Sequence, residues 1–216
     1  MRGITIIKDN IHLHTGDDLD LIQEVKELGN PTPQSYLVEV PGRNGLLNLT
    51  KGLTGNVCYK NRSLRFQYLG SGDKDILLDT VDLFNTYHGE TIKIIDDDTP
   101  DWYYEGEATV SVKRNGVLVT ITLDVDADPF RQRLELTNRV TDLTTDAKNI
   151  VINNYGVTVA PTVIVSNNAQ ITFKGTTYTL SAGTYTIDNL ELKPGSNILT
   201  VSGSGNLTIQ YREAKI

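Results

Sequence analysis

Short runs in which apolar and polar residues alternate follow one another along almost the whole chain. In the first part they cover Gly3–Lys8, Gln34–Val40, Asn56–Tyr59, Ser63–Leu69, Thr91–Ile95, Trp102–Val112 and Leu118–Val125. Alternation with a period of two and enrichment in β-branched and aromatic residues are typical of half-buried strands. Arg114-Asn115-Gly116 separates the last two runs, and Asn-Gly favours a type I′ hairpin turn. The sequence therefore predicts a mainly β fold.

One segment has a helical period instead. Within Asp73–His88 an apolar stripe is formed by Ile76, Leu77, Thr80, Val81 and Phe84. This spacing predicts an amphipathic helix, with Asp73 or Asp75 as N-cap and Gly89 as C-cap. Leu19–Leu28 is a weaker candidate for a second helix or an irregular turn. The first part is thus expected to be an α+β domain with one clear helix, covering residues 1–135.

From Asn149 onward the pattern is of strands alone. The expected strands are Ile150–Asn153, Val157–Val165, Ala169–Lys174, Thr177–Leu180, Thr184–Ile187, Leu190–Leu192, Asn197–Ser202 and Leu207–Arg212. Turn residues such as Pro194-Gly195 separate them, which predicts a small β-sandwich or barrel over 149–216. The Thr- and Asp-rich segment 136–148 is expected to be the linker.

The charge is acidic and unevenly placed. The net charge is −7, and residues 1–135 hold 14 Lys and Arg against 22 Asp and Glu, whereas residues 136–216 hold 6 against 5. Such a surface repels duplex nucleic acid, so no sequence-specific nucleic-acid binding is expected. No apolar run approaches the roughly 20 residues of a membrane helix. With one cysteine, Cys58, and no signal-peptide pattern, the chain is expected to fold in the cytoplasm.

Three groups of residues could in principle hold a metal ion. Asp124, Asp126 and Asp128 with Glu135 match four positions of a calcium loop, but Pro129 stands where that loop needs glycine. The run Asp96–Asp98 with Asp101 is the second group, and the pair of His12 and His14 is the third. The adjacent carboxylates of the Asp run point in divergent directions, and a solvated loop is the alternative interpretation of that run. The sequence places no third ligand beside the histidine pair. We therefore expect no metal and no cofactor.

No catalytic pattern is present either. The chain has no Gly-x-Ser-x-Gly, Walker A or dinucleotide-binding motif, and Cys58 has no identifiable base beside it. These observations favour a binding or structural protein over an enzyme.

Pro41, Gly42, Arg43, Asn44 and Gly45 form a compact turn signal between two strand-like runs. Such a turn could cradle a phosphate or simply reverse a strand. Proline fixes φ and the two glycines permit positive φ, so we interpret the motif as a structural turn that presents Arg43 outward.

Several stretches, taken in order, resemble the distal tail (Dit) proteins of siphophages that infect Gram-positive bacteria. They are His14–Ile22, Val40–Gly45, Tyr59–Arg62 with Phe66, Tyr87–Gly89, Ile94–Asp98, Trp102–Tyr104 with Gly106, Asp128–Arg131, Leu192–Ile198 and Leu207–Arg212. Their order and spacing carry the resemblance, which covers nearly the whole chain.

The resemblance implies a virion protein of the phage tail tip, assembled in the host cytoplasm. It implies a homohexameric ring formed by the N-terminal domain, with a galectin-like β-sandwich projecting outward and no catalytic residues. Partners would be the tail tube protein, the tail-associated lysozyme or tail fibre protein, and receptor-binding proteins. The alternative is a module that binds cell-wall polysaccharide, with Tyr155, Phe173, Tyr178, Tyr185 and Tyr211 as candidate sugar platforms.

A ring of this kind would carry a lumen through which DNA passes. Six copies would hold a formal charge of −42, six times −7. A lumen lined by carboxylates would repel phosphates. The candidate lumen-facing acids are Asp73, Asp75, Asp79, Asp96, Asp97, Asp98, Asp124 and Asp126. The alternative is that these acids only keep the outer surface soluble.

Overall fold

The computed structural model describes residues 3–42, 44–50, 57–71, 74–187 and 189–216. It divides into two compact units, one up to Arg131 and one over Gln132–Lys215. Strands dominate both units, so the predicted mainly β fold class is confirmed.

The first unit is built on one antiparallel sheet, in which the strands lie in the order β2-β1-β9-β10-β11-β8-β3. Their bounds are β1 Ile4–Lys8, β2 Ile11–His14, β3 Ile22–Leu28, β8 Arg62–Ser71, β9 Thr91–Asp96, β10 Trp102–Asn115 and β11 Leu118–Ala127. The Asn-Gly signal is a hairpin turn as predicted: Asn115 pairs with Leu118, and Gly116 has a φ of +64°. Buried and less buried residues alternate along β11, so one face of the sheet carries the core and the other is open to water.

Helix α2 (Lys74–Asn85) buries Val81 and Phe84 against the core face of this sheet. The helix ends at Asn85, and residues 86–89 form a turn. Gly89 has a φ of +78°, but its N–H donates to the carbonyl of Ala108 on β10, so it is not the helix C-cap that the sequence predicted. The proposed N-cap Asp73 lies outside the described residues. Leu19–Leu28 is not helical: residues from Ile22 onward form strand β3. The helical pattern of this segment is weak, and its backbone forms hydrogen bonds with β8 instead, which makes it a strand.

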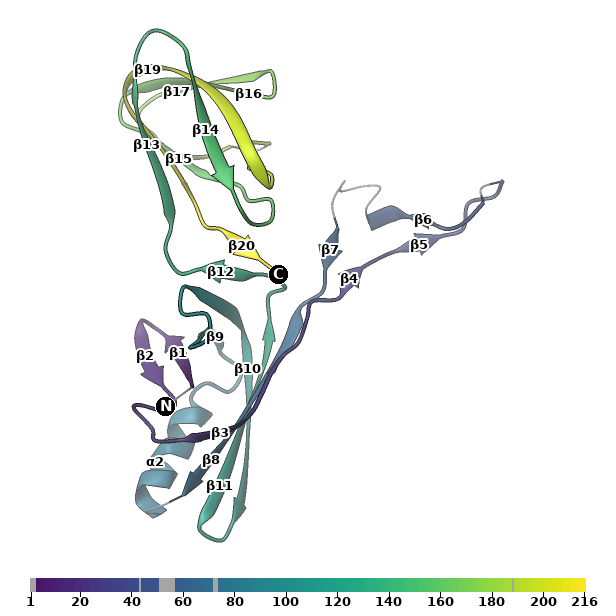
Figure 1. Cartoon of the computed structure of the whole chain (residues 1–216), viewed down its shortest axis with the longest axis vertical. Helices are drawn as coiled ribbons and strands as arrows, with labels where there is room; N and C mark the ends of the chain where they lie inside the picture. The colour runs from purple at the N-terminus through teal and green to yellow at the C-terminus, as the bar shows by residue number, and fades with distance from the viewer. Residues whose placement is uncertain (1–2, 43, 51–56, 72–73, 188) are drawn as a thin grey trace. The chain divides into compact units, whose positions relative to one another are not determined.

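A narrow arm extends from the first unit beyond β3 and β8 (Figure 1). It consists of two short antiparallel pairs, β4 (Pro33–Gln34) with β7 (Cys58–Tyr59) and β5 (Leu37–Val38) with β6 (Leu47–Asn48). The motif that begins at Pro41 lies between β5 and β6, where the chain reverses. Gly42 and Gly45 have φ values of +81° and +83°, whereas Arg43 lies outside the described residues. Positive φ explains the two glycines of the motif.

The second unit is a sandwich whose two sheets share one strand. The strands are β13 Thr137–Leu143, β14 Lys148–Asn154, β15 Thr162–Val165, β16 Asn168–Phe173, β17 Thr176–Leu180, β18 Gly183–Thr186 and β19 Gly195–Tyr211. The short strands β12 (Arg131–Arg133) and β20 (Ala214–Lys215) pair with each other and are not part of the sandwich sheets. The first half of β19 pairs with β14 and β16, and its second half with β13 and β15. β19 joins two runs that the sequence suggested were separate.

The bend in β19 occurs at Gly203 and Gly205. Gly203 has a φ of +143°, and a Cβ atom there would lie 2.1 Å from the carbonyl oxygen of Asn168. Glycine is therefore required at this corner. The expected linker 136–148 differs from the structure, because most of it is strand β13 paired with β19. Its many Thr residues suit a strand, and its Asp residues lie at the exposed edge and ends.

Candidate functional site

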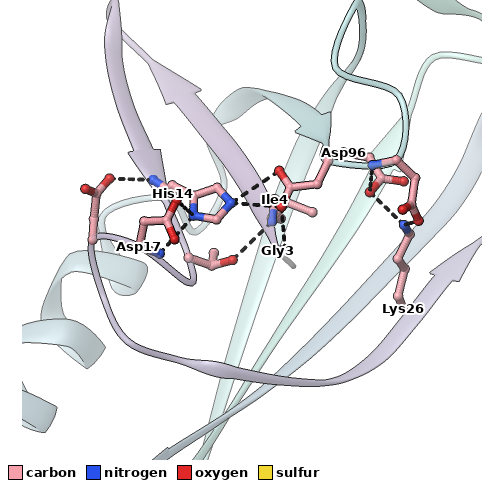
Figure 2. A network of polar contacts seen from close by, with 10 residues as sticks. Gly3, Ile4, His14, Asp17, Lys26 and Asp96 are labelled. Atoms are coloured by element: carbon pink, nitrogen blue, oxygen red, sulfur yellow. Dashed lines mark hydrogen bonds and ion pairs between the residues drawn. The ribbon is translucent and has the colours of Figure 1, made fainter. Parts of the chain in front are cut away.

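A network of polar contacts joins three distant segments of the first unit (Figure 2). The segments are the β1–β2 hairpin with the turn after it, strand β3, and the end of β9. The central residues of the network are His14, Lys26 and Asp96 to Asp98. The contacts that His14 and Lys26 make with the three aspartates span 70 or more positions of sequence. A shallow hollow lies over part of the network and is lined by Gly3, residues 22–26 and residues 96–98.

Both ring nitrogens of His14 are engaged. Nδ1 accepts the backbone N–H of Asp17 at 2.9 Å, so the ring proton of the neutral imidazole sits on Nε2. Nε2 lies 3.1 Å from Oδ2 of Asp97, which also accepts the N–H of Gly3 at 2.8 Å. The ring therefore has no free nitrogen with which to take a proton from a substrate. Its contacts hold the β1–β2 hairpin against the β9–β10 turn.

Lys26 bridges two carboxylates of the Asp run. Its ammonium nitrogen lies 2.6 Å from Oδ1 of Asp96 and 2.6 Å from Oδ2 of Asp98. Burial opposes its charge, but the hydrogen bonds and the negative charges of Asp96 and Asp98 outweigh this and raise the pKa of Lys26. The amine stays protonated, so it is not a nucleophile at neutral pH.

The same geometry bears on metal binding at the Asp run. The Lys26 ammonium occupies the position between Asp96 and Asp98 where a cation would sit. Within the described ranges, no group of three His, Cys, Asp or Glu side chains is arranged to hold a metal ion. His12 lies exposed on β2.

A second cluster of acids lies on the open face of the sheet. An open hollow there is lined by Asn61, Thr91, Glu105, Gly106, Glu107, Asp126 and Asp128. The register places Glu107 directly opposite Asp126, and Thr109 opposite Asp124. The neighbouring Arg65 is neutralised, because its Nε and Nη2 lie 2.7 and 3.1 Å from the two carboxylate oxygens of Asp124. Lys93 lies directly opposite Glu105 in the register. The four acids that line the hollow outnumber this lysine, so this part of the face is negative.

The candidate lumen acids fall on three different elements. Asp96, Asp97 and Asp98 belong to the polar network, and Asp124 and Asp126 lie on the open face of β11. Asp75 and Asp79 are exposed on α2, and Asp73 lies outside the described residues. Sequence reasoning missed Glu105 and Glu107. Counting back from the Asn-Gly turn would have placed Glu107 opposite Asp126, because the hairpin register is continuous.

The arm exposes an unusual amount of apolar surface. Tyr36, Leu37 and Leu46 are each more than half exposed. Isolated two-stranded ribbons are marginally stable in water, so a ribbon with exposed apolar side chains gains stability when another molecule covers it. The arm is therefore the part of the first unit best suited to contact another molecule.

Most candidate sugar platforms of the second unit are not available at its surface. Phe173 and Tyr211 are buried, and Tyr178 and Tyr185 pack against the core. Tyr155 alone of the five is freely exposed, at 71%. A sugar site on this unit would have to be built around Tyr155.

The described helix is too short and too polar to cross a membrane. Cys58 is partly buried at the base of the arm in β7.

These features define a two-unit β protein: a helix-backed sheet with a projecting arm, followed by a sandwich. Among solved structures, the chain is similar to the crystal structure of the Dit protein of phage SPP1, described as a paradigm of the hub adsorption apparatus in phages that infect Gram-positive bacteria. The TM-score is 0.63 at 15% sequence identity, and the match covers 99% of each chain. The chain therefore has a Dit-like fold. No protein-family model and no curated protein matches the sequence.

Proposed function

We propose that this protein is a structural subunit of a phage tail tip, which assembles as a homohexameric ring between the tail tube and the receptor-binding machinery. Its partners would be the tail tube protein, a tail fibre or tail-associated lysozyme protein, and receptor-binding proteins. It would act in the virion and catalyse no reaction. The observation that carries this proposal is the similarity of fold to SPP1 Dit along the full length of both chains.

The arm supplies a means of self-association. Its exposed Tyr36, Leu37 and Leu46 are apolar, and burying them against a neighbouring copy contributes roughly 25 cal/mol per Å² of area removed from water. A contact between the arm of one subunit and the body of the next is heterologous, and repetition of such a contact closes a ring when the rotation fits.

The open face of the sheet supplies a surface suited to a DNA channel. Glu105, Glu107, Asp126 and Asp128 lie together there, and Asp124 already pairs with Arg65. Phosphates would be repelled from this face, so DNA would pass without adhering. We therefore assign the lumen to this face of the β9–β10–β11–β8 sheet. Of the eight acids suggested by the sequence, Asp124 and Asp126 fit this assignment.

The mass of the particle in solution tests the assembly. Multi-angle light scattering should give six copies of 23.9 kDa, which is about 143 kDa. A monomer at high concentration would reject the ring. Assembled rings should also fail to retain linear duplex DNA at low salt, whereas rings that carry Glu107→Lys with Asp126→Lys should retain it. Equal behaviour of the two rings would place the lumen on another face.

A further inference from the structure

A small apolar cavity opens between helix α2 and the β10–β11 hairpin, away from the polar network and from the acidic open face. Its volume is about 190 Å³, and Leu77, Leu78, Val117 and Val119 supply its apolar lining, with Gly116 at the turn. Drug-sized ligands occupy roughly 300–1,000 Å³, whereas an apolar cavity of about 150 Å³ holds a benzene ring. The size therefore suits a single aromatic or leucine side chain.

The rim of the cavity is apolar and uncovered. Val117, which lines the cavity, is 76% exposed. In the part of the chain that the structure describes, no segment covers this side chain. An apolar rim around an apolar cavity is the arrangement of a hot spot, in which one anchor side chain inserts and the surroundings exclude water.

Two cations line the cavity. Lys74 and Arg114 have no ion pair with a described carboxylate, whereas Lys26 and Arg65 elsewhere in the first unit are paired with aspartates. The exposed Asp75 and Asp79 of α2 do not line the cavity. The pocket thus places two cations without a described ion pair beside an apolar hole.

We propose that this surface, the α2–hairpin pocket, docks an acidic peptide segment of another polypeptide. One aromatic or leucine side chain of that segment would fill the cavity, and its carboxylates would face Lys74 and Arg114. The opposite charges favour such a segment and speed its association. Nucleic acid and anionic lipid fit less well, because the surrounding unit is strongly acidic.

The arm of a second copy is a weaker match by charge. Residues 33–50 hold one carboxylate, that of Glu39, against the two cations that line the pocket. The pocket therefore goes beyond ring assembly and would serve a different partner.

A labelled synthetic peptide tests the proposal on the full-length chain. The probe is a fluorescein-labelled Asp-Asp-Phe-Asp-Glu peptide, with Asn and Gln in place of its acids as one control and Ala in place of Phe as another. Fluorescence anisotropy should show saturable binding of the acidic aromatic peptide, weakened by added salt. Both control peptides should bind at least about tenfold more weakly, a difference of about 1.4 kcal/mol.

Matched substitutions then locate the site. Arg114→Glu and Val117→Asp should each weaken binding at least tenfold, whereas Arg139→Glu and Val140→Asp, equivalent changes at exposed positions of the second unit, should leave it unchanged. The proposal fails if the peptide does not bind at about 1 mM, or if both pairs of variants behave alike. If Arg114→Glu instead changes the mass of the assembly, the occupant is a second copy and the proposal is likewise overturned. Variants of the arm should not change peptide binding at the pocket. The proposal of a ring and the proposal of peptide docking can therefore fail independently of each other.

Discussion

The ammonium nitrogen of Lys26 lies 2.6 Å from a carboxylate oxygen of Asp96, whose side chain is only 3% exposed. The pair joins β3 to the end of β9 across 70 positions of sequence. Removing one member of a buried ion pair leaves the other charge without compensation, which costs far more than the pair contributes.

Lys26→Met should therefore lower the free energy of unfolding by about 3 kcal/mol at neutral pH. Lys113→Met, at an exposed lysine without an ion pair, should change it by less than about 0.5 kcal/mol. Because the pKa of Lys26 is raised, its contribution is present below its ordinary value of 10.5 and is lost as the pH rises through the folded value. Urea denaturation between pH 7 and 11 measures both effects. Equal stability of the two variants would show that solvent already screens the pair.

Tyr68 should make the protein sensitive to alkali. Its ring is completely buried, and burial raises the pKa of its hydroxyl far above that of an exposed tyrosine. In the unfolded chain this group ionises above about pH 10, so wild-type stability should fall there by up to about 1.4 kcal/mol per pH unit. Tyr68→Phe should be within about 1 kcal/mol of wild type at pH 7 and should lose less stability above pH 10. Burial also raises the pKa of Tyr87 and of Tyr211. Both residues are present in wild type and in the variant, so their contributions cancel in the comparison. Parallel pH profiles would contradict the prediction.

The corner of β19 should not accept a side chain. Gly203→Val would place Cβ against the Asn168 carbonyl and would strain φ, so a loss of about 3 kcal/mol or more is expected. Gly175 has a φ of +84° with open space around it, and Gly175→Asn should cost about 1 kcal/mol or less because Asn tolerates this conformation. Thermal unfolding of the full chain compares the two. If Gly203→Val lowered the stability only slightly, strand β16, which begins at Asn168, would be able to move away from the new side chain.

The arm should be required for assembly and not for folding. Leu37→Asp with Leu46→Asp should abolish the ring and leave a folded monomer, because both side chains are exposed in the single subunit. Val151→Asp with Ile198→Asp, a matched exposed pair in the second unit, should leave assembly intact. Light scattering gives the mass and circular dichroism the fold. Loss of the ring in the control pair alone would move the interface to the sandwich.

The sequence predicted those elements whose signal is local. Asn115-Gly116 fixed the β10–β11 hairpin, and the apolar stripe from Ile76 to Phe84 fixed α2. Elements decided by pairing with distant strands were missed or misjudged. Ile22–Leu28 becomes a strand only because β8 lies beside it, and Thr137–Leu143 only because β19 does.

The candidate sites follow the same rule. Lys26 and His14 have no local pattern that links them to Asp96 and Asp97. In the sheet β1 is a neighbour of β9, but β3 lies at the opposite edge, so the contact of Lys26 with the end of β9 is tertiary and does not follow from strand order. The α2–hairpin pocket likewise requires Val117 and Leu77 to meet across 40 residues of chain. Periodicity predicts which side chains are buried but not which elements lie beside each other.

The shared strand β19 sets the order in which the second unit can form during synthesis. Its strands β13 and β14, and one side of β15, find their partner only when residues 195–211 have left the ribosome. Until then those edges are unpaired, and unpaired edges are prone to join other chains. Hairpin β16–β17 can form earlier because its two strands are adjacent. The seven consecutive strands from β2 to β3 in the sheet of the first unit are all complete by residue 127, so this unit can begin to fold while the sandwich is still being made.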